Sequence, residues 1–142
     1  MMDASFAPYR IAGAFLEEKI EQEGIANPTI GIICGSGLSG LSDALSGKIV
    51  TVKYSDIPGF PSQTTVKGHK GEIVFGMLNG VPTMCFRGRF HCYEGHDMKT
   101  VVLPVKVMRC LGIKIVIVTN AAGGLNPKNN VGDVLCINDH LA

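Results

Sequence analysis

The apolar positions of the chain follow helical spacing in some segments and strand-like runs in others. Near the N-terminus they recur every three or four residues, which predicts a helix over residues 9–23. Residues 29–34 form a short apolar run typical of a strand that is buried on both faces. Gly35 ends this run, and a short helix is expected over residues 38–45. The first third of the chain therefore predicts a helix, a strand, a glycine turn and a second helix.

The rest of the chain contains further strand patterns and one helix. The pair Asn79-Gly80 between two apolar runs is a strong hairpin signal. Asp97 can cap a helix that extends to Leu111, and Pro104 should kink or break it. The expected strands cover residues 49–54, 72–78, 81–86, 113–119 and 133–137, with the β-branched run 113–119 as a central strand.

Because strands alternate with helices and one hairpin interrupts them, the sequence predicts a single α/β domain over residues 1–142. Its sheet should be mixed and mostly parallel, with flanking helices. A chain of 142 residues that is 46% hydrophobic can bury one substantial core.

Composition narrows the possible partners and the compartment. The net charge is +1 and no basic run occurs, so neither nucleic acid nor an anionic membrane is an expected partner. No apolar run approaches membrane-spanning length, and the first residues lack a signal core. The five cysteines are scattered and the four histidines show no metal-ligand spacing, so we expect free thiols, no metal and a cytoplasmic location.

The stretch Arg87-Gly88-Arg89-Phe90-His91-Cys92-Tyr93-Glu94-Gly95 carries the densest candidate chemistry. If it is extended, Arg89, His91 and Tyr93 share one face. A guanidinium, an imidazole and a phenol placed together suit an anionic or phosphorylated substrate. The alternative is a polar edge strand in which Arg89 and Glu94 form a solvated ion pair.

Two small-residue segments are further candidates. Gly35-Ser36-Gly37 follows a buried strand, so its backbone N–H groups and the Ser36 hydroxyl could bind an anion. Asn120-Ala121-Ala122-Gly123-Gly124 follows the expected central strand, and the backbone N–H near Ala121 could do the same. His69 lies in a loop that could close over the site. The alternatives are tight turns without a ligand and an exposed histidine.

Five segments together resemble the trimeric class of purine nucleoside phosphorylases, in that family's order and at its intervals. They are Ile33-Cys34-Gly35-Ser36-Gly37-Leu38, Ile57-Pro58-Gly59-Phe60-Pro61, Gly68-His69-Lys70-Gly71, Gly88-Arg89-Phe90-His91-Cys92-Tyr93-Glu94-Gly95 and Thr119-Asn120-Ala121-Ala122-Gly123-Gly124-Leu125-Asn126-Pro127. The resemblance covers nearly the whole chain from about residue 30, and it implies the nucleoside phosphorylase fold.

The resemblance also implies an activity in purine salvage. Phosphate would attack C1′ of a purine ribo- or deoxyribonucleoside and release the free base and a sugar 1-phosphate. No cofactor is implied, only inorganic phosphate as co-substrate, and the implied assembly is a homotrimer. The implied phosphate ligands are Ser36, His69, Arg89, His91 and the backbone of Ala121, with His91 and Arg89 catalytic. Tyr93 would contact the ribose, while Glu94 and Asn120 would support these groups.

The chain also departs from the family's pattern. The family's chain is roughly twice as long, and its purine-recognising residues lie in the half without a counterpart here, so the resemblance implies an N-terminal portion. Arg87 stands where the family often has an uncharged residue, and we expect it to affect the phosphate site little.

Three alternative functions remain open from the sequence. One is the related methylthioadenosine phosphorylase, which shares the fold. Another is a non-catalytic fragment that binds phosphate or subunits. The third is a dinucleotide-binding protein built on the glycine turn at Gly35, although the context of that fingerprint is poor.

Overall fold

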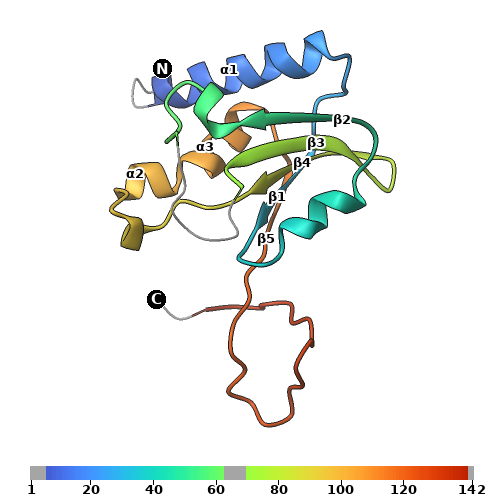
Figure 1. The fold of residues 1–142 in the computed structure, drawn as a ribbon, viewed down its shortest axis with the longest axis vertical. Helices are drawn as coiled ribbons and strands as arrows, with labels where there is room; N and C mark the ends of the chain where they lie inside the picture. Colours follow the sequence, from blue (N-terminus) through green and yellow to red (C-terminus); the bar gives the residue numbers. More distant parts are fainter. Residues whose placement is uncertain (1–5, 63–69, 141–142) are drawn as a thin grey trace.

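The computed structural model describes residues 6–62 and 70–140. In these residues the chain forms one five-stranded sheet in the order β2-β3-β4-β1-β5. The strands are β1 (Ile30–Cys34), β2 (Ser46–Lys53), β3 (Glu72–Leu78), β4 (Val81–Arg87) and β5 (Ile115–Val118). The sheet, its helices and the chain that leaves β5 are seen in Figure 1.

The mixed α/β architecture is confirmed, but parallel pairing does not predominate in the described sheet. β1 pairs in parallel with β4 and with β5, whereas β2, β3 and β4 pair antiparallel in sequence. The antiparallel half follows from the hairpin between β3 and β4. Its turn residues Asn79 and Gly80 have φ values of 48° and 82°, which is the left-handed pair that a two-residue hairpin turn requires.

The long helices lie on one face of the sheet. They are α1 (Ala7–Gln22) and α3 (Leu103–Cys110), which follows the short α2 (Met98–Val101). The helix predicted from Asp97 is confirmed with its break. The Asp97 carboxylate accepts a hydrogen bond from the Thr100 N–H at 2.8 Å, and Pro104 lies in the first turn of the second segment, which begins at Leu103.

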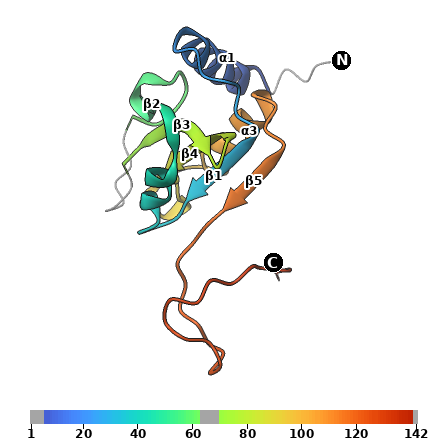
Figure 2. The same ribbon diagram turned by 90° about the vertical axis from the view of Figure 1, so that its right-hand side faces the viewer.

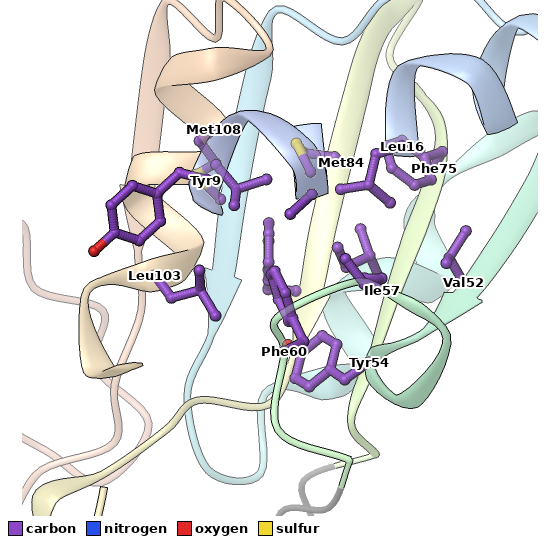
Figure 3. Close-up of a cluster of buried hydrophobic side chains, with 14 of the residues drawn as sticks. Tyr9, Leu16, Val52, Tyr54, Ile57, Phe60, Phe75, Met84, Leu103 and Met108 are labelled. Atoms are coloured by element: carbon purple, nitrogen blue, oxygen red, sulfur yellow. The ribbon is translucent and has the colours of Figure 1, made fainter. Parts of the chain in front are cut away.

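The main core lies between this helical layer and the sheet. Figure 3 shows Leu16 of α1 and Met108 of α3 beside Met84 of β4 and Phe75 of β3. Each of these four side chains is fully buried. A smaller cluster on the opposite face contains Ile32, Cys34, Leu45, Val74 and Cys85. The second cluster lies on the side of the sheet where the 3₁₀ helix η2 (Ser39–Ala44) follows the glycine turn.

The prediction for residues 113–119 is only half correct. A parallel strand forms there, but β5 is the edge of the described sheet and not a central strand. Its four aliphatic residues, Ile115, Val116, Ile117 and Val118, are each 41–57% exposed. No described helix or loop therefore covers either face of β5, as Figure 2 shows.

The predicted strand at residues 133–137 is wrong. Residues 119–140 contain no regular strand or helix and extend away from the sheet. Apolar side chains in this segment are largely exposed, including Leu125, Val134 and Ile137. A strand requires a neighbour for its backbone hydrogen bonds, and the described residues offer none to this segment.

In the described residues, no helix has both the length and the apolar character needed to cross a membrane.

Candidate functional site

The three predicted site segments meet because parallel strands end at the same edge of a sheet. β4, β1 and β5 are adjacent and parallel, with Cys34 in register with Arg87 and Ile33 in register with Val118. Arg89, Ser36 and Ala121 each follow the end of one of these strands within three residues. The carboxyl ends of such strands are where open α/β sheets bind ligands. The carboxyl ends of these three strands therefore bring together residues that are up to 85 positions apart in the chain, from Ser36 to Ala121.

The glycine turn contacts the segment after β5 directly. The Gly35 N–H donates to Oγ1 of Thr119 at 3.0 Å, and the Thr119 hydroxyl donates to the Ile33 carbonyl at 3.1 Å. A Cβ on Gly35 would lie 2.4 Å from the Thr119 carbonyl oxygen and 2.8 Å from Cα of Asn120. Only glycine permits this approach, which keeps exposed Ser36 beside the segment that carries Ala121.

The helix after this turn is shorter than the sequence suggested. It is the six-residue 3₁₀ helix η2, not an α-helix. Such a short element adds little helix dipole, so any anion at this turn would depend on individual N–H groups and on Ser36.

The stretch from Arg87 to Gly95 is anchored through its aromatic residue and a carbonyl. Gly88 has a φ of 134°, and its carbonyl accepts a hydrogen bond from the hydroxyl of buried Tyr54 at 2.7 Å. The Phe90 ring is buried against Tyr54 and Phe60, with ring centroids 5.2 and 5.9 Å apart. Gly88 and Phe90 are thus both held against the core. This fixes the backbone positions of Arg89 and His91, which flank Phe90.

The stretch is not extended along its whole length, because Cys92–Glu94 forms the 3₁₀ helix η4. The turn nevertheless brings two candidate side chains together. The rings of His91 and Tyr93 stack with centroids 4.6 Å apart and planes 16° apart. Tyr93 itself is 74% exposed. Its phenol therefore has room for a partner beside the imidazole.

Glu94 lies against His91, and the two residues contact each other through backbone groups. The Glu94 carboxylate accepts a hydrogen bond from the His91 N–H at 3.1 Å. In return, the His91 side chain accepts from the Glu94 N–H, so the two residues form a reciprocal capping box. This arrangement fixes the orientation of the imidazole relative to η4.

Arg87 forms two charge contacts near the end of β4. Its guanidinium lies 3.1 Å from the Glu72 carboxylate and 3.9 Å from that of Asp43. The side chains of Arg87 and Glu72 are only 13% and 18% exposed, whereas that of Asp43 is 75% exposed. Glu72 is therefore the main partner of Arg87.

His69 lies outside the described residues, so its predicted place at the phosphate remains a prediction. The end of the same loop is described. The N–H groups of Lys70 and Gly71 both donate to the Arg87 carbonyl at 3.0 Å. Lys70 and Gly71 therefore lie at the end of β4, next to the other site segments.

One hollow in the described residues lies elsewhere. It has a volume of about 420 Å³ and is lined by Phe6, Arg10, Arg109 and Cys110, between α1 and α3. None of the predicted site residues contributes to it. Among the described residues, no group of three or more His, Cys, Asp or Glu side chains is placed to hold a metal ion.

Sequence reasoning assigned no supporting contact to Tyr54, Thr119 or Arg87. Burial raises the pKa of the Tyr54 phenol above its usual range, so this hydroxyl stays a proton donor to Gly88. A tyrosine that ends an apolar strand pattern could have signalled this role, since a buried hydroxyl needs a partner. The contacts of Thr119 and Arg87 depend on strand register, which no local pattern reveals.

Comparison with known proteins shows which family the sequence matches. The sequence profile of the Phosphorylase superfamily matches residues 29–142. The purine nucleoside phosphorylase of Bos taurus is 45% identical over 137 residues, which is 96% of this chain and 45% of the relative. Purine nucleoside phosphorylase 1 of Bacillus subtilis is 46% identical over 130 residues, with 92% and 46% covered. The chain thus spans less than half the length of these curated relatives.

Solved structures show the same relation. A Schistosoma mansoni purine nucleoside phosphorylase in complex with adenosine matches with a TM-score of 0.76 and 42% identity, over 88% of this chain and 41% of that one. A purine nucleoside phosphorylase in complex with ribose-1-phosphate also has a TM-score of 0.76, with 43% identity over 88% and 44% of the two chains.

Proposed function

The chain belongs to the phosphorylase superfamily, and from this premise we propose that it takes part in purine nucleoside phosphorolysis. In the proposed reaction, inorganic phosphate cleaves the bond between the purine and the sugar of a ribo- or deoxyribonucleoside. The products are the free base and a sugar 1-phosphate. One observation carries the proposal: three predicted phosphate-binding segments follow adjacent parallel strands to one edge of the sheet.

Within this site, the proposed phosphate ligands are Ser36, Arg89, His91 and the backbone N–H of Ala121, with His69 from the loop after β2. The exposed ring of Tyr93, stacked on His91, suits a sugar contact. Glu94 supports His91 through the capping box, and Asn120 supports the turn at Gly35, which lies against it.

The chemistry suits such a set of groups. Breaking the glycosidic bond develops positive charge on the sugar, and a phosphate dianion held below C1′ stabilises that charge as it attacks. Arg89 and His91 would fix the dianion in line for attack, which lowers the entropic part of the barrier. The reaction needs no nucleophile from the protein and no cofactor beyond phosphate.

The relatives supply the finer parts of the proposal. They are named purine nucleoside phosphorylases, and solved structures contain adenosine or ribose-1-phosphate, so a purine nucleoside is the proposed substrate. We also propose a homotrimer and a cytoplasmic location. The free thiols of all five cysteines are compatible with a reducing compartment.

The test is phosphate-dependent release of hypoxanthine from inosine by the purified 142-residue chain. We expect release to require phosphate, and Arg89→Ala to raise the phosphate concentration needed by at least tenfold, because it removes a charge-assisted contact. Methylthioadenosine is the control substrate. Preferential cleavage of the thioether nucleoside would contradict the proposed specificity.

Binding is measured in parallel, by the phosphate-dependent rise of the melting temperature at constant ionic strength. No hypoxanthine release from a folded chain that phosphate stabilises would limit the function to a phosphate half-site. Neither release nor stabilisation would refute the proposal for this chain.

A further inference from the structure

We propose that Arg87 is a positioning residue for the anion, acting through Glu72 and the main chain. In this role it neutralises a buried carboxylate at the edge of the phosphate site and holds the site segments in register. The inference rests on the function proposed above and goes beyond it, since Arg87 is not among the proposed phosphate ligands. It also replaces the expectation that Arg87 affects the site little.

The first observation is the burial of the ion pair. Arg87 and Glu72 are direct cross-strand partners on β4 and β3, with guanidinium and carboxylate 3.1 Å apart. Both side chains are more than four-fifths buried. Nε of Arg87 is buried and makes no hydrogen bond within the described residues. A pair that is removed from water to this extent is screened weakly, so each charge acts strongly on its surroundings if the other is lost.

The second observation is the number of site segments that meet at this residue. The Arg87 carbonyl accepts the N–H groups of Lys70 and Gly71, which immediately precede β3. In the sheet, Arg87 is in register with Cys34, which immediately precedes the turn at Gly35. Arg89 follows two residues later in the chain. Displacing Arg87 would therefore disturb all three segments at once.

Removing one partner of the ion pair changes the phosphate affinity in a direction that depends on which charge is removed. A purely structural role of the pair would give the same direction in both cases. Without Arg87, the Glu72 carboxylate is an uncompensated negative charge beside a site for a dianion, and it repels phosphate. Without Glu72, the Arg87 guanidinium keeps only the exposed Asp43 carboxylate at 3.9 Å, so most of its positive charge is left to attract phosphate. One elementary charge within about a Debye length of the anion changes the affinity by roughly fivefold.

The experiment is a phosphate titration of the 142-residue chain, followed by thermal shift with sodium chloride added to keep the ionic strength constant. The variants are Arg87→Gln, Glu72→Gln, the double variant and Arg87→Lys. Circular dichroism checks that each variant is folded before phosphate is added. Lys53→Gln is the matched control, because Lys53 is the other cross-strand partner of Glu72 yet forms no ion pair with it in the described residues.

We expect Arg87→Gln to weaken phosphate binding by roughly fivefold and Glu72→Gln to strengthen it by a similar factor. The double variant and Arg87→Lys should lie within about twofold of the wild-type chain. The same holds for Lys53→Gln, because Lys53 is exposed and salt screens its charge, unlike the largely buried pair. Opposite shifts in the two single variants are the signature of the proposal, because both variants break the same pair and lose stability alike.

Equally weakened phosphate binding in both single variants, or unchanged binding in both, would overturn the proposed role of Arg87. Phosphate binding by the wild-type chain would in that case still support the proposed function. A folded wild-type chain without any phosphate response would refute the phosphate site, and the positioning role with it. If Arg87→Gln does not fold, the sign of the Glu72→Gln shift decides, with weaker binding counting against the proposal.

Discussion

Tyr54 offers the most direct test of how the candidate site is attached to the core. Its side chain is 1% exposed and its hydroxyl donates to the Gly88 carbonyl at 2.7 Å. Tyr54→Phe keeps the ring and its contacts with Phe60 and Phe90 but removes the donor. The Gly88 carbonyl, in a buried residue, would then lose this partner.

The expected loss follows from the burial of both groups. Leaving a buried acceptor without its donor costs about 1–2 kcal/mol of the free energy of unfolding. For a domain of this size the melting temperature should fall by about 3–8 °C. Urea denaturation measures the loss, and the m-value should be unchanged because the same surface is exposed on unfolding.

Tyr9→Phe is the matched control for this measurement. Tyr9 is also buried, at 8% exposed, but its hydroxyl accepts a longer, partly buried hydrogen bond of 3.3 Å from Lys106. We expect this variant to lose less than about 0.5 kcal/mol. Equal losses of stability in the two variants would refute the argument that Tyr54 anchors Gly88. So would a loss below about 0.3 kcal/mol in Tyr54→Phe, which is the size of an ordinary surface substitution.

Three further outcomes are expected. Gly35→Ala should lower the free energy of unfolding, measured in urea, by about 1–3 kcal/mol, because the added Cβ would lie 2.4 Å from the Thr119 carbonyl oxygen. Gly123→Ala is the control, since a Cβ there would have nothing within 4 Å. An unchanged stability in Gly35→Ala would contradict the close approach. Ile117→Lys should reduce self-association in sedimentation velocity while changing stability by less than about 0.5 kcal/mol, since β5 is an uncovered edge. A wild-type chain that stays monomeric at high concentration would count against it. Burial raises the pKa of the Tyr54 phenol, so above about pH 10 this phenol ionises only in the unfolded chain. The free energy of unfolding should therefore fall as the pH rises beyond that value, and less steeply in Tyr54→Phe than in the wild-type chain. Equal slopes of stability against pH in the two chains would exclude the effect.

The sequence determined the features that depend on near neighbours in the chain. Helical spacing located α1, and a continuous apolar run located β1. The pair Asn79-Gly80 defined a hairpin because few other residues adopt two successive positive φ values. Asp97 and Pro104 set the start and the break of the helical segment before β5. In each case the cause lies within a few residues of the effect.

The tertiary structure decided what depends on which strands are adjacent. The same β-branched pattern suits a central or an edge strand, so only the sheet order shows that β5 is an edge among the described residues. The apolar pattern at residues 133–137 forms no strand because no described neighbour pairs with it. Likewise, the ion pair of Arg87 with Glu72 exists because register places them opposite each other.

The candidate site is divided in the same way. The sequence alone indicated that Arg89, His91 and Ser36 could bind an anion, because this chemistry is intrinsic to their side chains. Their convergence, and their support by Tyr54 and Thr119, come from parallel strands that end at one edge. A contact between residues far apart in the chain is fixed by the packing of the whole sheet, and no local pattern encodes it.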